Sequence, residues 1–286
     1  MLARAQPLLG TLVEIKLIAG DHDTELLASN AAFAEIAEIH HLMSFHEPES
    51  DISRLNCNGS RCPVQVDPRT FEVLLIAQQL SNASNGMFDC TVGAHLIALG
   101  FLPAPGCRNL PVKDASYRDV ILLEDHRVQF SRSLRIDLGG IAKGYAVDRA
   151  IQVLREHGIH SACVNAGGDI RVIGDHPWPV SVRLPYDQSR VSRLSRFQDA
   201  AIATTAGYYS EKIVDGVTVS PLIDPRTGYS HIHNYSVSVI ASSCVYADGL
   251  TKIIWLTGDE HHPLLRQFHA RAFIMKEKQE KIYAVA

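Results

Sequence analysis

The sequence predicts an α+β fold, in which helices are mixed with antiparallel hairpins. Some segments show the two-residue alternation of strands, and others show the three- and four-residue apolar spacing of helices. Several strands follow one another after only a short turn, which favours hairpins over the strand–helix–strand alternation of a doubly wound sheet. The composition is that of a folded chain, because 46% of the 286 residues are hydrophobic and 20% are charged.

The first elements are a strand and a long helix. Residues 10–18 alternate and are rich in β-branched side chains, so we expect a strand there. Residues 23–43 predict a helix because their apolar side chains recur at helical spacing. The residues that show this spacing are Phe33, Ile36, Ile39 and Met43. The polar stretch that follows, up to about residue 63, is expected to be a loop.

A second helix, a hairpin and a third helix are expected next. Asp67 and Pro68 are the residue types preferred at an N-cap and at the first helical position, so a helix should run from there to about residue 81. Residues 119–137 alternate on both sides of a turn and predict a hairpin. Residues 142–157 predict a helix that Gly158 ends.

The last third of the chain contains mostly strands. We expect strands near 161–165, 169–173, 178–184, 200–204 and 235–242, and a closing hairpin at 270–276 and 281–285. The Arg- and Ser-rich residues 185–198 are expected to form a surface loop, and residues 245–257 a helix. We find no internal repeat, and the length of 286 residues allows about two domains or one large unit.

Charge and cysteine content narrow the function. The net charge of −4 (27 Lys and Arg against 31 Asp and Glu) argues against nucleic acid as a partner. No stretch approaches the ~20 apolar residues of a membrane span. The chain as given is therefore expected in the cytoplasm, unless a signal segment is missing from its start. Its six cysteines are expected to be scattered thiols, although Cys57 and Cys62 could pair in an oxidising compartment.

Five short stretches combine glycine with polar residues in the manner of ligand-binding loops. The most informative runs from Asp137 to Asp148, from a strand through two glycines into a helix. Such a helix start either binds a phosphate group through its backbone N–H groups or only packs a helix on a sheet. The other four stretches are Asn165–Ile170, Thr204–Gly207, Ile223–Gly228 and Tyr246–Leu250. The Gly-Gly-Asp of the first is more typical of a tight turn, and Ile223–Gly228 either forms a turn or binds a ligand. Asp248 in the last either caps a helix or coordinates a cation that neutralises a phosphate.

Taken in order, eight motifs resemble those of the FAD:protein FMN transferases of the ApbE type. They are Pro7–Ile15, Met43–Asn56, Phe88–Gly93, Asp137–Asp148, Asn165–Asp169, Ala203–Gly207, Ile223–Gly228 and Ala247–Leu250. The resemblance covers nearly the whole chain and implies that residues 1–286 form a single unit, either undivided or made of two intertwined lobes. It implies an ApbE-like, T-fold-related fold with a flavin cleft between two lobes. It also implies an enzyme that moves FMN from FAD onto a Thr or Ser hydroxyl of a target flavoprotein and releases AMP.

The resemblance also implies site residues. Asp248 and the backbone carbonyl of Ala142 match metal ligands for Mg²⁺, a hard ion that prefers oxygen. Asp248 and Lys252 are the candidate catalytic residues. The residues expected to contact the flavin nucleotide are Met43, His46, Asp89, Asp137, Gly139, Gly140, Lys143, Asp169 and Thr204.

Three positions depart from the family pattern. Lys252 stands where the family has a metal-binding Thr, and Thr251, one residue earlier, is rotated by about 100° on a helix and cannot replace it. The ammonium of Lys252 either pairs with Asp248 and the pyrophosphate, replacing Mg²⁺, or points to solvent. Pro221 stands where the family has a His suited to act as a general base. His46 stands where the family often has Tyr, which is the mildest change.

These departures leave two alternatives to the transferase. The first is an FAD-binding protein that has lost transfer and acts as a carrier or assembly partner. The second is an FAD pyrophosphatase that uses water in place of the acceptor hydroxyl. His231 and His233 lie a few residues after Pro221 and either reach back to supply the missing base or, as is more common for a loop His, are only solvated.

Overall fold

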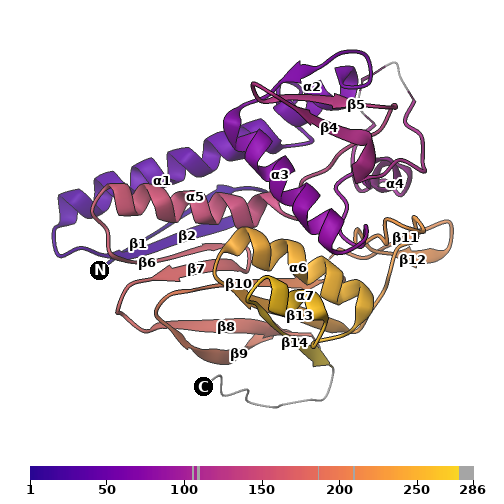
Figure 1. Cartoon of the computed structure of the whole chain (residues 1–286). Helices are drawn as coiled ribbons and strands as arrows, with labels where there is room; N and C mark the ends of the chain where they lie inside the picture. Colours follow the sequence, from indigo (N-terminus) through magenta and orange to yellow (C-terminus); the bar gives the residue numbers. More distant parts are fainter. Residues whose placement is uncertain (105, 108–109, 186, 209, 277–286) are drawn as a thin grey trace. The chain divides into compact units, whose positions relative to one another are not determined.

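A computed structural model describes residues 1–104, 106–107, 110–185, 187–208 and 210–276 (Figure 1). The chain forms two compact units, each built from separated segments. The first unit comprises Met1–Glu38, Lys143–Ala206 and the chain from His233 onward. The second comprises Ile39–Ala142 and Gly207–Ile232. Both units combine helices with antiparallel sheet, so the predicted α+β class is confirmed.

The first unit is built on a seven-stranded sheet in which every neighbouring pair is antiparallel. Its strands, in spatial order, are β1 (Leu2–Leu8), β2 (Thr11–Ile18), β6 (Ser161–Ala166), β7 (Asp169–Ile173), β10 (Ala200–Ala206), β13 (Tyr235–Ala241) and β14 (Arg271–Lys276). Strands β2 and β6 are far apart in the sequence, and Ile15 pairs with Val164. The sheet therefore brings the first and last thirds of the chain together.

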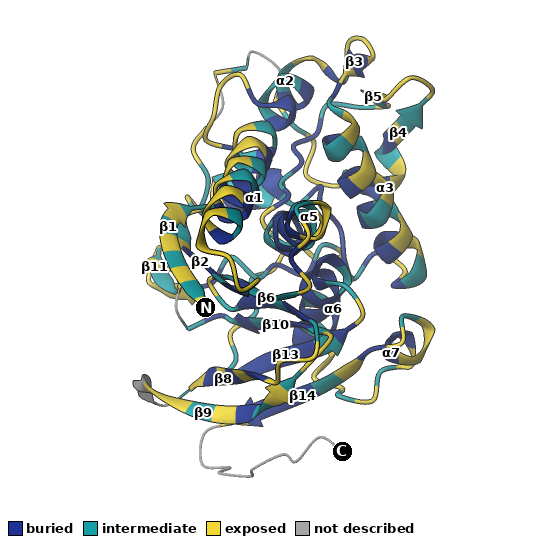
Figure 2. Ribbon diagram, turned by 90° about the vertical axis from the view of Figure 1, so that its left-hand side faces the viewer, coloured by how far each residue is buried: buried dark blue, intermediate teal, exposed yellow. Residues whose placement is uncertain are grey.

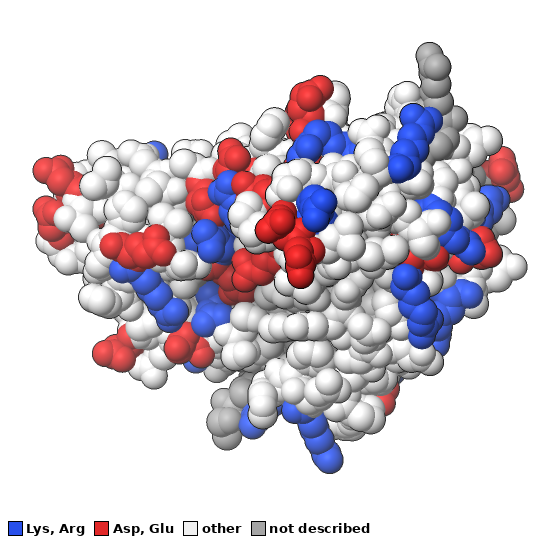
Figure 3. All heavy atoms as spheres, turned by 45° about the horizontal axis from the view of Figure 1, so that its top comes forward, with Lys and Arg blue, Asp and Glu red and all other residues white. Residues whose placement is uncertain are grey.

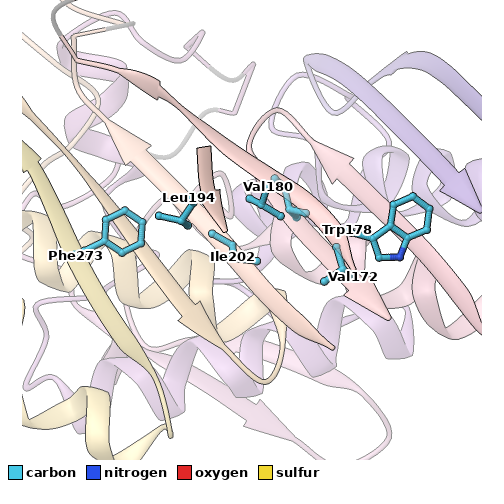
Figure 4. Packing of buried hydrophobic residues seen from close by; sticks show 7 residues of the cluster. Val172, Trp178, Val180, Leu194, Ile202 and Phe273 are labelled. Carbon is cyan, nitrogen blue, oxygen red and sulfur yellow. The ribbon is translucent and has the colours of Figure 1, made fainter. Parts of the chain in front are cut away.

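Helices cover one face of this sheet, and a hairpin covers the other (Figure 1). The helices are α1 (His22–Met43, whose last residues belong to the second unit), α5 (Ala142–Glu156), α6 (Cys244–Thr257) and the short α7 (Pro263–Gln267). The hairpin consists of β8 (Trp178–Leu184) and β9 (Asp187–Phe197). Its inner side chains Trp178, Val180 and Leu194 pack against sheet residues that include Val172, Ile202 and Phe273 (Figure 4).

The prediction of a surface loop at residues 185–198 is wrong, because most of this segment is strand β9. It pairs with β8 over its length, with Ser181 opposite Arg193 and Trp178 opposite Phe197. Among the residues of β9 whose burial is described, Leu194 alone is buried, whereas Val191 and Arg193 are exposed, so the sequence hides the strand. Figure 2 shows much of β9 in the colour of exposed residues. Pairing with β8 and one inward face stabilise this strand, and its own composition does not reveal them.

Most other expected elements of the first unit are confirmed within one or two residues. The apolar positions that predicted α1, from Phe33 to Met43, are all buried. The prediction omitted β1 and α7. The second strand of the expected closing hairpin, at 281–285, lies outside the described residues.

The second unit combines short helices with a three-stranded sheet of order β3-β5-β4. Its elements are α2 (Asp51–Asn58), β3 (Val64–Gln65), α3 (Pro68–Ala83), α4 (Gly93–Ala98), η1 (Tyr117–Asp119), β4 (Val120–Leu123), β5 (Arg127–Phe130) and the hairpin β11 (Lys212–Val214) and β12 (Val217–Val219). The carboxylate of Asp67 caps α3 by accepting the N–H of Arg69 at 2.9 Å, as expected. The prediction of a loop up to about residue 63 is wrong in part, because helix α2 lies within that segment.

Asn56 at the end of α2 fixes the segment that leads into the Asp137 motif. Its side-chain oxygen accepts the N–H of Ile136 at 2.7 Å, and its amide donates to the carbonyl of Ile136 at 3.0 Å. The buried guanidinium of Arg135 donates in turn to the backbone carbonyl of Asn56 at 2.9 Å. Buried polar groups of this kind are costly unless paired, so these bonds specify one position for the segment.

The expectation that all six cysteines are free thiols is wrong for two of them. Cys57 pairs with Cys107, with 5.2 Å between their Cα atoms, and not with Cys62. Cys62 is an exposed free thiol, and Cys90, Cys163 and Cys244 are free thiols as expected. The sequence cannot reveal the pair because its partners lie 50 residues apart and meet only in the folded second unit.

Two global features concern membrane spans and surface charge. Among the described helices, none is both long and apolar enough to cross a membrane. On the face shown in Figure 3, acidic side chains accompany the basic ones, and no extended purely basic area is seen there. That face gives no support for nucleic acid as a partner.

We predict that the Cys57–Cys107 disulfide stabilises the second unit by up to about 4 kcal/mol, the chain-entropy value for a loop of ~50 residues. Replacing both cysteines with Ser should speed hydrogen exchange, measured by mass spectrometry, in peptides that cover α2 and α3. Cys62→Ser is the matched control and should leave exchange unchanged. Equal exchange in the double variant and the wild type would contradict the stabilising role.

Candidate functional site

Four charged side chains from three elements of the first unit form one cluster. Lys143 stands in the first turn of α5, Asp169 begins β7, and Asp248 and Lys252 lie one turn apart on α6. The ammonium of Lys143 is 2.6 Å from Asp169 and 3.4 Å from Asp248. The ammonium of Lys252 contacts the other oxygen of Asp248. The structure thus brings together four of the predicted site residues.

The cluster depends on a close approach of α5 and α6. A Cβ atom on Gly144 would lie 2.4 Å from the carbonyl oxygen of Cys244 and 2.9 Å from the Cβ of Asp248, so only glycine fits there. The backbone N–H of Gly144 donates to the carboxylate of Asp248 at 3.2 Å. Gly144 therefore allows the two helices to pack closely and orients the carboxylate of Asp248.

Asp148 of α5 fixes the start of α6. Its carboxylate accepts the backbone N–H groups of Cys244 at 2.9 Å and of Val245 at 2.8 Å. These N–H groups have no partner within α6, and the side chain of the N-cap residue Ser243 makes no capping bond. Arg171 holds the same carboxylate at 3.4 Å. Asp148 is therefore a positioning residue for Asp248 and Lys252.

In this cluster the pKa values of the two carboxyl groups shift in opposite directions. Burial alone would raise the pKa of Asp248, but Lys143 and Lys252 outweigh it and hold that pKa below its usual value. Burial and the nearby charge of Asp248 raise the pKa of Asp169, and Lys143 only partly offsets them. Burial would lower the pKa of Lys143, but the two carboxylates raise it. Asp248 is therefore the more strongly ionised acid.

Two neighbouring threonines of β10 point to opposite faces of the sheet. The hydroxyl of Thr205 lies 2.6 Å from that of Thr251 on α6, so Thr205 faces the helices. The hydroxyl of Thr204 lies 2.8 Å from that of Ser238 on β13, and the alternation of a strand places it on the other face. Thr204, a predicted flavin contact, is thus not brought to the cluster. Thr251 is fully buried, in agreement with its exclusion as a metal ligand.

The donors around Asp248 do not fit a divalent cation. Both carboxylate oxygens already face an ammonium group. Two unit charges 4 Å apart repel by about 4 kcal/mol at an effective dielectric constant of 20, and a divalent ion doubles this. Among the described residues, no group of three or more His, Cys, Asp or Glu side chains could hold a metal. Magnesium at Asp248 and the carbonyl of Ala142 stays a prediction that these contacts do not favour.

The other predicted flavin contacts belong to the second unit. Asp89 is buried, and its carboxylate accepts the N–H and hydroxyl of Thr91 and the N–H of Tyr117, all at 2.8 Å. Burial raises the pKa of Asp89 despite these bonds. Because its oxygens already accept three hydrogen bonds, this carboxylate stabilises the loop in which it lies. Asp137 accepts the N–H of Gly139 at 3.1 Å, which shapes the glycine turn.

The remaining positions of the second unit differ in accessibility. Met43 and Ala142 are buried, His46 and Gly139 are exposed, and Gly140 is intermediate. Exposed His46 and the open turn at Gly139 can meet a ligand from solvent, whereas Met43 belongs to the core.

The segment after Pro221 is a tight hairpin. Asp224 accepts the N–H of Gly228 through its backbone carbonyl at 2.8 Å, and its carboxylate pairs with Arg226 at 2.8 Å. The two interpretations of this motif are a turn and a ligand-binding site. The turn is sufficient, because the charges of Asp224 and Arg226 pair with each other within it. The N–H of His231 donates to the carbonyl of Leu222 at 2.9 Å, which places His231 opposite the residue after Pro221.

His233 has a different setting in the first unit. Its ring stacks on Tyr235 with centroids 4.5 Å apart and contacts the edge of Trp255 at 5.2 Å. It serves aromatic packing. His231 is thus the histidine that shares a hairpin with Pro221.

Comparison with known proteins identifies the family of the chain. The model of the ApbE family matches residues 9–274. The chain belongs to the ApbE family. It is 32% identical over 271 residues to the FAD:protein FMN transferase of Vibrio cholerae, covering 89% of this chain and 80% of that protein. It is 28% identical over 313 residues to the enzyme of the same name from Treponema pallidum, covering 99% and 86%.

Solved structures of ApbE proteins share the fold. The ApbE protein of Thermotoga maritima superposes with a TM-score of 0.83 at 28% identity, covering 96% of this chain and 93% of that one. The flavin transferase ApbE of Vibrio cholerae gives a TM-score of 0.80 at 28% identity, covering 96% and 92%. The predicted resemblance and fold are confirmed, and these relatives support the prediction of a transferase.

The sequence does not reveal the roles of three residues that position segments of the two units. The carboxylate of Asp148 accepts an N–H group 96 residues later in the chain, and no local signal shows this. Asn56 bonds to Ile136, 80 residues away, and is equally hidden. The sequence does not distinguish Thr205 from Thr204, because a period of two does not say which face of the strand meets the helices.

We predict that Asp148→Ala lowers the free energy of unfolding of the first unit by about 1–2 kcal/mol, as for the loss of a helix cap. Both tryptophans of the chain, Trp178 and Trp255, lie in this unit, so tryptophan fluorescence during urea unfolding measures the effect. Asp199→Ala is the matched control, because Asp199 also contacts Arg171, at 3.6 Å, but is largely exposed. Equal loss in both variants would rule out the capping role.

Proposed function

We propose that this chain is an FAD:protein FMN transferase that moves FMN onto a Thr or Ser hydroxyl of a target flavoprotein. Two observations support this. The relatives that cover most of the chain carry that name. The first unit holds two ammonium groups, those of Lys143 and Lys252, and Lys143 stands in the first turn of helix α5. Such a site suits a pyrophosphate group. The gathered ammonium groups are the observation that carries the proposal.

The reaction exchanges one P–O bond for another. The acceptor hydroxyl oxygen forms a bond to the phosphorus of the FMN half, and the bond from that phosphorus to the bridging oxygen breaks. AMP leaves with the bridging oxygen, and the hydroxyl proton passes to a base. Lys143 and Lys252 would stabilise negative charge on the pyrophosphate, and Asp248 would hold both ammonium groups in position.

The flavin-contacting roles of the second unit remain part of the proposal. We infer that exposed His46 and the turn at Gly139 and Gly140 contact the nucleotide, with Asp137 shaping that turn. Asp89 and Met43 would support the site from inside the unit. That residues 1–286 act as one functional unit is likewise proposed.

The proposal is tested by incubating the protein with FAD and a domain that bears an acceptor Thr, with and without Mg²⁺. Flavin fluorescence of the acceptor in a denaturing gel, together with AMP release, is expected. AMP and FMN without a labelled acceptor would indicate a pyrophosphatase instead. Tight FAD binding with neither product would indicate a carrier or assembly partner.

We predict that Pro221→His raises the rate of transfer by about 100-fold, the lower end of the range for a general base. Proline has no side chain that can accept the hydroxyl proton. The initial rate of acceptor labelling measures the effect, and Pro221→Ala is the control for a change in the backbone. If the Ala variant gains as much, the gain does not come from proton transfer.

A further inference from the structure

Lys252 is held on Asp248 by the geometry of α6. The two residues are four positions apart, which places them on one face of the helix. The ammonium of Lys252 contacts one carboxylate oxygen of Asp248 and lies 3.1 Å from the backbone carbonyl oxygen of Asp248. The side chain of Lys252 is 18% exposed, so it is not directed out into solvent.

The charges of the cluster cancel. Asp169 and Asp248 contribute two negative charges when ionised, and Lys143 and Lys252 contribute two positive charges. Oxygen sites for hard divalent ions use carboxylates that carry excess negative charge. This cluster has no such excess, because each carboxylate is already paired with an ammonium group. It suits an anion better than a cation.

Both lysines keep hydrogen-bonding capacity for a ligand. An ammonium group has three N–H donors. Among the described residues, Lys252 directs two of them to Asp248, and Lys143 directs two to Asp169 and Asp248. The side chains of Lys143 and Lys252 are 30% and 18% exposed. Each can therefore offer its third donor to an anion that arrives from solvent.

We propose that Lys252 replaces the divalent cation in this chain and, with Lys143, binds the pyrophosphate of FAD directly. This rests on the proposed function, because it assumes that FAD is the ligand. Charge-assisted hydrogen bonds from two ammonium groups supply the neutralisation that a metal supplies elsewhere. FAD binding to this chain is then independent of Mg²⁺.

Three variants test the proposal. Lys252→Thr removes the ammonium and supplies a hydroxyl oxygen beside Asp248. Lys252→Met removes the ammonium without supplying a ligand and keeps the length of the side chain. Lys16→Thr is the matched control, because Lys16 pairs with Glu14 on β2 in the same unit and is 42% exposed. Circular dichroism establishes that each variant is folded.

The first measurement is FAD affinity by isothermal titration calorimetry, in EDTA and in Mg²⁺. The wild type and Lys16→Thr should bind FAD equally in both. Lys252→Met should bind roughly 10- to 100-fold more weakly in both, as expected for the loss of one charged hydrogen bond. Lys252→Thr should bind weakly in EDTA and regain affinity in Mg²⁺.

The second measurement uses no flavin and no activity. Mn²⁺ binding is measured through the electron paramagnetic resonance signal of the free ion. We expect no tight site in the wild type and a new site in Lys252→Thr. A wild type that needs Mg²⁺ to bind FAD, or that binds Mn²⁺ as tightly as Lys252→Thr does, would overturn the replacement while leaving the transferase proposal intact. A wild type that binds no FAD under either condition would overturn both.

Discussion

The close approach of α5 and α6 at Gly144 is the contact on which the candidate site depends. A single methyl group at this position would collide with the carbonyl of Cys244. Because the helices can touch there, the N–H of Gly144 reaches Asp248, and the carboxylate of Asp148 reaches the first N–H groups of α6. These bonds fix the rotation of α6, and with it the direction of Asp248 and Lys252. The sheet below contributes Asp169 from β7 to the same place.

Charge balance then determines what this site can hold. Asp248 lies between two ammonium groups, which lower its pKa against the effect of burial. A carboxylate in that setting orients lysines and has little remaining attraction for a cation. The lysines keep partial access to solvent and free hydrogen-bonding capacity for an anion. The proposal that this site binds a pyrophosphate group in place of magnesium therefore rests on these four residues.

Local signals in the sequence predicted the fold class and most elements, and their failures have physical causes. Helix α1 was predicted because its buried side chains repeat at helical spacing, and α3 because Asp67 caps it. Strand β9 was missed because its outward face is polar and, among its residues whose burial is described, Leu194 alone is buried. The Cys57–Cys107 pair was missed because its partners are remote in sequence. Long-range pairing stabilises both features, and no short window contains it.

The sequence by itself determined the family and the candidate positions, because eight ordered motifs are preserved in one chain. It also singled out Lys252 and Pro221 as departures. Only the tertiary structure decided which candidates meet: Lys143, Asp169, Asp248 and Lys252 do, whereas Thr204 faces the other side of its sheet. It also decided that Lys252 pairs with Asp248 and does not point to solvent. The reason is that the directions of Asp248 and Lys252 depend on the rotation of α6 against α5. Contacts between residues far apart in the sequence determine that rotation.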